Sequence, residues 1–189
     1  MNFALWLPIL AVALVILWVV ILYNGLVKAR AQVREGWSGI SVQLRRRADL
    51  VPNLVNTVSA YAAHERGLLE EVTARRVDAT KAANPADAAK ADSALGSMLG
   101  RLMVVAEAYP ELKADANFRS LQDELAEIET ELQGARRYYN ATVRDLNTRI
   151  GSFPALIVAG PLGFHEEPFF KDDDPAIATA PSVRFDQKN

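Results

Sequence analysis

The chain begins with an uninterrupted apolar stretch, residues 3–22, in which no side chain is charged. Twenty helical residues rise about 30 Å, which matches the hydrocarbon thickness of a bilayer. Most of the stretch is Leu, Ile, Val or Phe, and Trp6 and Trp18 lie near its two ends, where aromatic rings settle at headgroup level. We therefore predict a membrane-spanning helix from Phe3 to Leu22.

Two other interpretations of this stretch are a cleaved signal peptide and a buried core helix. A signal peptide has a basic segment before a shorter apolar region, and no Lys or Arg precedes this stretch. Instead, Lys28, Arg30 and Arg34 follow it. This asymmetry favours a retained anchor with its N-terminus outside and the rest of the chain in the cytoplasm, with a periplasmic bundle as the alternative.

Beyond the span the pattern becomes periodic, with apolar residues three or four positions apart. Such spacing forms one apolar ridge along a helix, as in bundles and coiled coils. The first ridge consists of Leu26, Val33, Trp37, Ile40, Leu44, Val51, Leu54, Val58 and Tyr61. Only Arg30 and Arg47 interrupt it, so the anchor is expected to run into a long amphipathic helix.

Pro52 lies inside this helical pattern. A proline in a helix interior removes a hydrogen bond and costs about 3 kcal/mol. The helix either continues through a kink at Pro52, or breaks so that Asp49 caps a new helix with Pro52 in its first turn. Because the apolar ridge keeps its register across the proline, we favour the continuous, kinked helix.

Three further periodic segments follow, at residues 65–83, 86–109 and 118–150. A proline or glycine lies just after each of them, which is typical of helix ends. No strand-length alternation occurs between residues 26 and 151. We predict an all-α fold in which an N-terminal transmembrane helix is followed by an elongated antiparallel bundle of three or four helices.

The C-terminal tail differs in composition from the bundle. Its phenylalanines are Phe153, Phe164, Phe169, Phe170 and Phe185, and several prolines separate them. From Gly163 onward, six acidic residues outnumber three basic ones. We expect an extended segment laid on the bundle or on a neighbouring subunit. The predicted organisation is an anchor at 1–25, a bundle at 26–151 and an extended tail at 152–189.

Composition narrows the possible functions further. The chain has 189 residues and a formal net charge of −2, so no global field attracts nucleic acid. It contains no cysteine, which excludes disulfides, thiolate metal sites and cysteine nucleophiles. Outside the anchor, its length suits one ordinary domain.

Catalytic motifs are missing from the sequence. A di-iron bundle requires Glu-x-x-His pairs on facing helices, yet Tyr61 stands three residues before His64 and Leu162 three before His165. There is no Walker or dinucleotide-binding glycine loop and no Gly-x-Ser-x-Gly elbow. We predict a protein that is not an enzyme and that has no catalytic, cofactor or metal site.

A polar line lies beside the apolar ridge of the last long segment, at spacings of seven, four and seven residues. It consists of Glu129, Arg136, Asn140 and Asn147. Two interpretations remain open: a partly buried hydrogen-bonding line that fixes helix register, or a polar seam to another subunit. The candidate interface therefore consists of this line together with Phe164, Phe169 and Phe170.

Several short groups of residues occur along the chain in a characteristic order. They include Tyr23-Asn24, Asp49-Leu50-Val51-Pro52-Asn53, His64-Glu65, Ala106-Glu107-Ala108-Tyr109-Pro110, Tyr139-Asn140 and Gly163-Phe164. In this order the chain resembles the LemA family, although Gly36 stands where that family more often has Ala. The resemblance implies a bacterial membrane protein with an N-terminal span and an elongated helical bundle, and it implies no particular activity.

These observations lead to a functional hypothesis. We expect a single-pass scaffold protein of the bacterial inner membrane whose partners are the lipid bilayer and further copies of itself, with other membrane proteins possible and no nucleic acid. A membrane-tethered sensor or adaptor is the first alternative, in which a shift of the Pro52 kink passes a signal through the anchor. A membrane-remodelling protein is the second.

Overall fold

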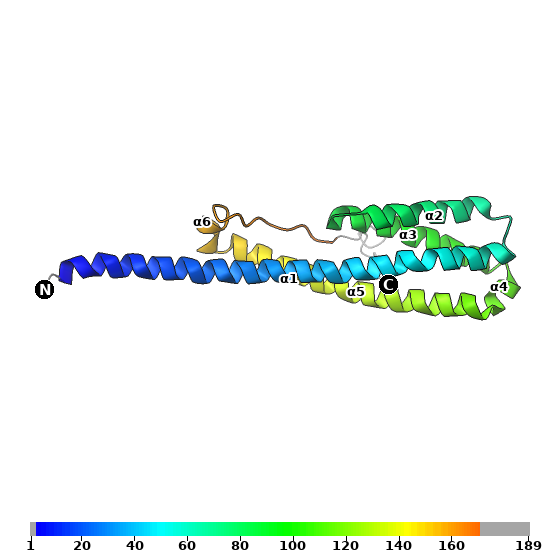
Figure 1. Cartoon of the computed structure of the whole chain (residues 1–189), viewed down its shortest axis with the longest axis horizontal. Coiled ribbons are helices and arrows are strands. Elements are labelled where there is room, and N and C mark those ends of the chain that lie inside the picture. The colour runs from blue at the N-terminus through cyan, green and yellow to red at the C-terminus, as the bar shows by residue number, and fades with distance from the viewer. Residues whose placement is uncertain (1–2, 171–189) are drawn as a thin grey trace, which may run out of the picture.

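The computed structural model describes residues 3–170, with side chains from Trp6 onward, and this part of the chain forms a long helical rod (Figure 1). Its helices are α1 (Phe3–Tyr61), α2 (Arg66–Lys81), α3 (Pro85–Ala106), α4 (Pro110–Ala114), α5 (Ala116–Gly151) and α6 (Ala155–Ala159). The described residues contain no strand, which confirms the predicted all-α fold. The side chain of Phe3 and the last part of the predicted tail, including Phe185, lie outside the described residues.

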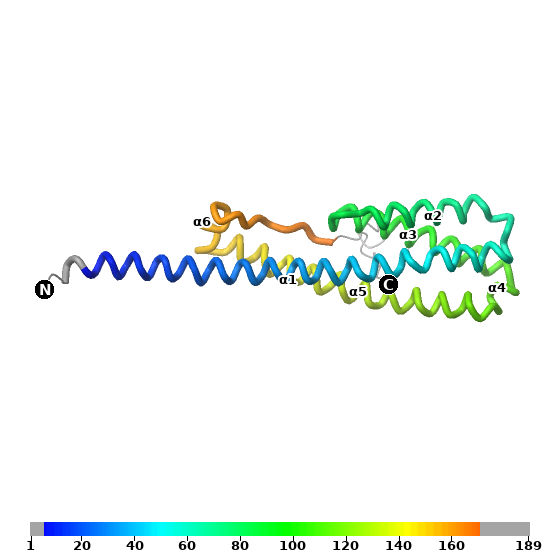
Figure 2. Tube along the Cα trace, viewed as in Figure 1, coloured from blue at the N-terminus to red at the C-terminus, as the bar shows by residue number. Residues whose placement is uncertain are grey.

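Helix α1 is the longest element of the rod, a single helix of 59 residues (Figure 2). Helix α5 packs beside it in the antiparallel direction, and α2 and α3 form a hairpin along its far half (Figure 1). Helices α1 and α5 are in close contact at Gly36, where an added methyl group would lie 3.0 Å from the Tyr139 Cα. A glycine at this position therefore lets the two helix backbones approach closely.

Helix α1 continues through Pro52, as the unbroken apolar ridge predicts. The proline deprives the Ala48 carbonyl of its usual intrahelical donor, four residues later. Arg76 of α2 replaces that donor, because its Nε donates a hydrogen bond of 3.0 Å to the Ala48 oxygen. The Asp49 carboxylate lies 3.9 Å from the same guanidinium, so Asp49 faces α2 within α1 and does not cap a new helix.

Two hydrophobic clusters form the core. The cluster nearer the N-terminus includes Leu26, Val33, Ile40, Leu132, Tyr139 and Leu146, from α1 and α5. The distal cluster includes Val51, Leu54, Val58, Leu95, Leu102 and Phe118, so it also takes side chains from α3. The predicted ridge of α1 supplies both clusters, and α5 joins them along the length of the rod.

The turns between helices follow local capping chemistry. The Asn84 side chain accepts a hydrogen bond of 2.9 Å from the Asp87 backbone N–H at the start of α3. The Asp115 carboxylate accepts one of 2.9 Å from the Phe118 N–H at the start of α5. This backbone bond, with a further one from the Tyr61 hydroxyl, holds the pKa of Asp115 below its usual range.

The segment around Pro110 differs from the sequence prediction. We expected the third periodic segment to reach Tyr109 and a loop to follow, but α3 ends at Ala106 and residues Pro110–Ala114 form the short helix α4. Pro110 suits the first position of a helix, because the backbone N–H that proline lacks would have no partner within the helix at that position. Leu112 is fully buried in the distal cluster and fixes α4 to the bundle.

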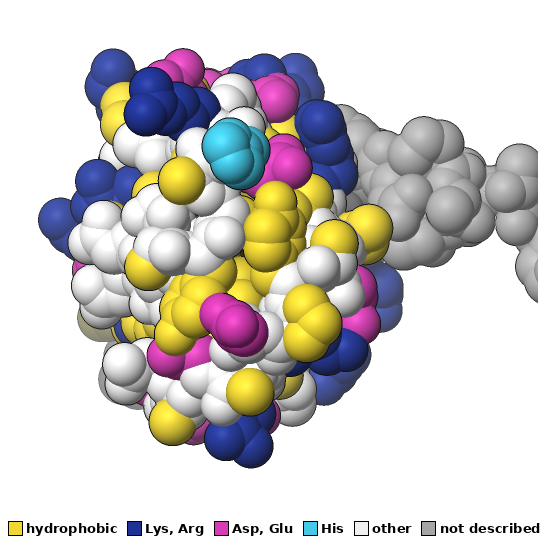
Figure 3. Space-filling model, turned by 90° about the vertical axis from the view of Figure 1, so that its right-hand side faces the viewer, with side chains coloured by type: hydrophobic (Ala, Val, Ile, Leu, Met, Phe, Trp, Pro, Cys, Tyr) yellow, Lys and Arg dark blue, Asp and Glu magenta, His cyan; other side chains and the backbone are white. Residues whose placement is uncertain are grey.

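The rod ends differently at its two extremities. Its end opposite the N-terminus shows basic, acidic and hydrophobic side chains intermixed over the surface (Figure 3). At the other end α1 projects alone, and its first turns have no neighbour among the described residues (Figure 1).

Candidate functional site

A buried ion network links three helices at the middle of the rod. Asp92 of α3 is 2% exposed and is the one buried charged residue in the part of the chain that the structure describes. Its Oδ1 lies 2.9 Å from the Arg47 Nη1 of α1, and its Oδ2 pairs with the Arg136 guanidinium of α5. The Glu129 carboxylate lies 3.2 Å from the same Arg47 nitrogen. The network thereby compensates the burial of the Asp92 charge.

Gly96 gives the network its space. It lies one turn after Asp92 on α3, and a methyl group added there would approach the Arg47 Nη2 to 3.4 Å. A side chain at this position would therefore press on the guanidinium that reaches across from α1.

An extended segment, residues 164–170, returns along α5 and is held by two asparagines. The Asn147 side chain donates to the Glu167 carbonyl and accepts from the Glu167 N–H, both at 2.9 Å. Asn140 makes the same pair of bonds with Phe170, at 3.0 and 2.9 Å. Each amide thus satisfies one backbone donor and one backbone acceptor, as a neighbouring strand would.

The spacing of the two asparagines matches the geometry of the segment they hold. Seven helical residues separate Asn140 from Asn147, a rise of about 10.5 Å. Three extended residues separate Glu167 from Phe170, a length of about 10 Å. The two amides therefore reach equivalent backbone positions, and we name this arrangement the asparagine clamp.

Tyr139, next to Asn140 on α5, adds a bond to Pro168, which lies between the two clamped residues. Its hydroxyl donates a hydrogen bond of 2.8 Å to the Pro168 carbonyl, and its ring is buried against Trp37. Burial raises the pKa of Tyr139 to about 12, and the nearby Glu167 carboxylate adds to the effect. The hydroxyl is therefore a firm donor at physiological pH.

A second attachment lies where the chain, after α6, turns back along the rod away from the N-terminal end (Figure 1). Gly163 has a φ of 77°, a left-handed conformation that glycine adopts without strain. Arg30 of α1 donates a hydrogen bond to the Gly163 carbonyl, and its guanidinium stacks 4.2 Å from the Phe164 ring centroid. The Tyr23 ring meets Phe164 edge-on at 5.6 Å.

The first part of α1 has the character of a membrane span. Its most apolar 18-residue window has a mean hydropathy of 2.7, and none of that window is buried. Among the described residues α1 is the one helix long and apolar enough to cross a membrane. The predicted span residues Trp6 and Trp18 are exposed, whereas Leu22 packs against the cluster nearer the N-terminus.

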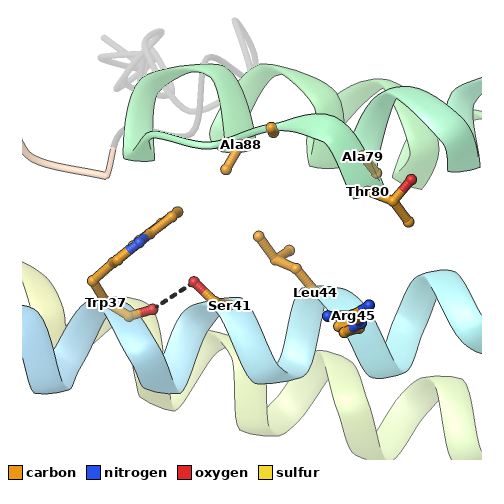
Figure 4. A pocket seen from close by; sticks show the side chains of 8 residues that line it. Trp37, Ser41, Leu44, Arg45, Ala79, Thr80 and Ala88 are labelled. Carbon is orange, nitrogen blue, oxygen red and sulfur yellow. Dashed lines mark hydrogen bonds between the residues drawn. The ribbon is translucent and has the colours of Figure 1, made fainter.

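A cavity of about 190 Å³ opens between α1 and the turn that joins α2 to α3 (Figure 4). Its lining is mixed, with Trp37 and Leu44 on one side, Ala79 and Ala88 on the other, and Arg45 at its edge. The lining residues do not pair a nucleophile with a base. The hydroxyl that α1 contributes, on Ser41, donates its hydrogen bond to the Trp37 carbonyl.

The histidines lie apart in the structure as they do in the sequence. His64 is exposed in the turn between α1 and α2, and His165 is exposed in the extended segment. In the described residues no three His, Asp or Glu side chains gather in a way that could hold a metal ion.

In the structure, residues of the predicted interface make contacts within their own chain. Glu129 and Arg136 belong to the ion network, and Asn140 and Asn147 form the asparagine clamp. Phe164 and Phe170 are buried, with Phe170 beneath the Arg136 guanidinium, while Phe169 stays 36% exposed. A contact of these residues with another subunit stays a prediction.

Three residues of these sites escaped the sequence analysis. Asp92 was passed over because it is charged at a position where the ridge demands an apolar side chain. Arg76 was one arginine among several on a polar helix face. Tyr139 has an apolar ring that fits the periodic pattern of residues 118–150, but the partner of its hydroxyl, the Pro168 carbonyl, leaves no trace in a sequence.

The fold and these contacts define a helical protein whose longest helix joins an exposed apolar end to a packed bundle, the architecture of a membrane-associated helical protein. The LemA family profile matches residues 36–185, so the chain belongs to the LemA family. The matched region begins after the predicted span, at Gly36, which faces Tyr139 of α5.

Three relatives are magnetosome proteins. Magnetosome proteins MamQ 1 and MamQ 2 of Paramagnetospirillum magneticum are each 25% identical to this chain, over 87% of its length and 70% of theirs. Magnetosome protein MamQ of Magnetospirillum gryphiswaldense is 23% identical, over 79% of this chain and 65% of its own. The family and these relatives support a membrane-associated helical protein.

Proposed function

We propose that the protein is a membrane-anchored helical scaffold that self-associates at the bacterial inner membrane. One observation carries this proposal: α1 is a single helix that is apolar and uncovered at its start and forms the core of the bundle further on. An anchor and a bundle that share one helix move as one body. The bundle is then held at a fixed angle to the bilayer.

Confinement to a membrane favours assembly. Anchored copies meet at a raised effective concentration, so weak lateral contacts suffice. Exposed apolar side chains are available on both long helices, with Val42 on α1 and Tyr138 on α5. Because Phe164 and Phe170 are already buried within the chain, these surfaces, rather than those two phenylalanines, support the proposed contact.

The test is the size of the full chain in mild detergent, measured by light scattering at several micromolar concentrations. We expect a mass above that of one protein chain, rising with concentration. Cysteine crosslinking in native membranes supplies an independent readout, because the chain has no cysteine of its own. A Tyr138→Cys variant is expected to form a disulfide-linked dimer. A protein that stays monomeric in both experiments would contradict self-association.

The sensor or adaptor role has one specific observation in its favour. Pro52 is accommodated in α1 because Arg76 of a different helix donates to the carbonyl that the proline leaves open. A partner that moved α2 would withdraw this bond and change α1 at the proline. In that case Pro52→Ala alters partner binding while the bundle stays folded, whereas a pure scaffold is indifferent to the substitution.

A further inference from the structure

We propose that the tip formed by residues 153–162, which contains α6, is a second membrane contact that lies in the lipid interface beside the span. The inference rests on the proposed function, because the span defines where the bilayer is. The partner is a lipid surface, and the residues that meet it belong to the predicted tail.

The level of the tip follows from the pairing of the two long helices. Gly36 faces Tyr139, and the helices run in opposite directions. Twelve residues lead from Tyr139 to Gly151 and twelve lead from Gly36 back to Asn24, so both rise about 18 Å. Helix α5 therefore ends at the level of Asn24, just where the predicted span ends.

The chain beyond α5 covers the last turn of the span. Val19 and Leu22 are partly buried, while Val20 and Ile21 between them are exposed, so one face of this turn has a neighbour. Ala159 of α6 belongs to the same cluster as Leu26, and Leu22 packs against that cluster. Figure 1 shows α6 beside α1, past the end of the α2–α3 hairpin. The tip thus overlaps the end of the apolar stretch.

The side chains of the tip are arranged as for lipid. Its small residues face inward, with Ala155 and Ala159 buried, while its large ones face outward. Phe153 is 82% exposed, Leu156 62% and Ile157 65%. A helix that packs on a core in water shows the opposite arrangement, with large apolar residues inside. An uncovered cluster of this kind marks a contact surface.

Charge distinguishes the tip from the rest of the rod. The basic residues Lys28 and Arg149 are exposed near the same level; Arg149 pairs with Asp145 at 2.8 Å, and Lys28 suits anionic headgroups. Arg30, Gly163 and Phe164 hold the tip against α1, so its position relative to the span is fixed. The far end of the rod carries basic, acidic and hydrophobic side chains intermixed (Figure 3). The tip differs because residues 153–162 themselves include no charged side chain.

Site-directed spin labelling of the full chain tests this inference, since the absence of cysteine makes single labels unambiguous. The labelled variants are Ile157→Cys at the tip, Leu14→Cys in the span and Val104→Cys on the bundle, all at exposed positions. Each is reconstituted in nanodiscs that contain anionic phospholipid. Collision of the nitroxide with oxygen, which concentrates in lipid, is compared with collision with a water-soluble nickel chelate.

We expect the ratio of oxygen to chelate collisions to be several-fold higher for the label at position 157 than for the label at 104, and highest for the label at 14. A label at 157 that matches the label at 104, while the label at 14 is in lipid, overturns the tip contact and leaves the anchor standing. A label at 157 shielded from both reagents indicates coverage by protein, such as a second copy, and also overturns it. If the label at 14 is in water, the proposed anchor and the tip contact fail together.

Discussion

At the scale of single residues, Asp92 is the position where one substitution should cost the most stability. It is 2% exposed and faces the guanidinium groups of Arg47 and Arg136, whose side chains are 14% and 16% exposed. Asp92→Asn keeps the shape of the side chain and removes its charge, so that two largely buried cations share the Glu129 carboxylate on Arg47 as counter-charge. Removing one partner of a buried ion pair typically costs 3–5 kcal/mol, and we expect about 3 kcal/mol because both arginines still touch solvent.

The loss is measured as the free energy of unfolding in denaturant, with the full chain in detergent. Asp123→Asn on α5 is a matched control, because Asp123 is exposed and surface changes of this kind stay within about 0.5 kcal/mol. Equal stability of the two variants would show that the network contributes nothing.

Tyr139 gives a prediction about pH. Burial raises its pKa in the folded protein to about 12, above the value of about 10 for an exposed tyrosine. The native state therefore binds this proton more tightly than the unfolded state. Its contribution to stability is complete below pH 10 and is lost as the pH rises through 12.

The matched variant is Tyr139→Phe, which removes the hydroxyl that donates to the Pro168 carbonyl. We expect it to lower the free energy of unfolding by about 1–2 kcal/mol at neutral pH, the cost of a buried acceptor that loses its donor. The difference between variant and wild type should then shrink as the pH rises from 10 to 12. A difference that stays constant across that range would contradict the raised pKa.

At the scale of secondary structure elements, helix α1 tolerates Pro52 only together with α2. The Ala48 carbonyl that lacks its intrahelical donor is satisfied by Arg76. We expect Arg76→Ala to cost about 1–3 kcal/mol in the wild-type background, because the carbonyl is then left without a donor. In a Pro52→Ala background, where the helix supplies its own donor, the same substitution should cost clearly less.

A double-mutant cycle on unfolding free energies measures this coupling. Arg75→Ala is the control for Arg76→Ala, since the neighbouring arginine is exposed and its ion pairs, with Glu71 and Asp78, lie within its own helix. Additive losses for Pro52→Ala and Arg76→Ala would mean that Arg76 acts independently of the proline.

The asparagine clamp fixes an extended segment without any strand partner. In an Asn140→Ala, Asn147→Ala variant, four hydrogen bonds to the segment are lost. We expect amide hydrogen exchange to accelerate at Glu167 and Phe170, whose N–H groups the two side chains accept from, while exchange within α1 stays slow. Asn56→Ala, at an exposed position on α1, is the control. Unchanged protection of both amides would show that packing alone holds the segment.

The pattern of apolar positions predicts elements better than it predicts which side chains meet. Along α1, Val51, Leu54 and Val58 keep one register across Pro52, and the helix is continuous as expected. The reason is that burying one ridge outweighs the local cost of the proline, because the Ala48 carbonyl finds another donor. That donor, Arg76, lies on a segment that the periodicity of α1 does not describe.

Helix α3 shows where such a pattern misleads. The predicted ridge there consists of Ala88, Ala91, Leu95, Met98, Leu102, Val105 and Tyr109. Ala88, Leu95 and Leu102 are buried as predicted, but in place of Ala91, Met98 and Val105 the most buried positions are Asp92, Leu99 and Ala106, each one residue later. A ridge drawn through apolar residues must avoid Asp92. The aspartate is nevertheless buried because arginines from two other helices reach it, and such a long-range partner has no local signature.

At the scale of the whole molecule, the orientation of the span decides on which side of the membrane the bundle lies, because α1 is unbroken between the two. Lys28 and Arg34 are exposed just beyond the span, and Arg30 holds the returning chain at the same level. Basic residues next to a span stay in the cytoplasm preferentially. We therefore predict a cytoplasmic bundle and an N-terminus outside.

The measurement uses the Val104→Cys variant in intact spheroplasts, treated with a maleimide that cannot cross membranes. Val104 is 72% exposed on α3, so accessibility of the site does not limit the reaction. Labelling of position 104 should occur only after the spheroplasts are opened. A cysteine appended to the N-terminus should react while the spheroplasts are still intact. The reverse pattern would place the bundle in the periplasm. The tip would then meet the outer face of the membrane, because its level is set by α1 and not by the side on which the bundle lies.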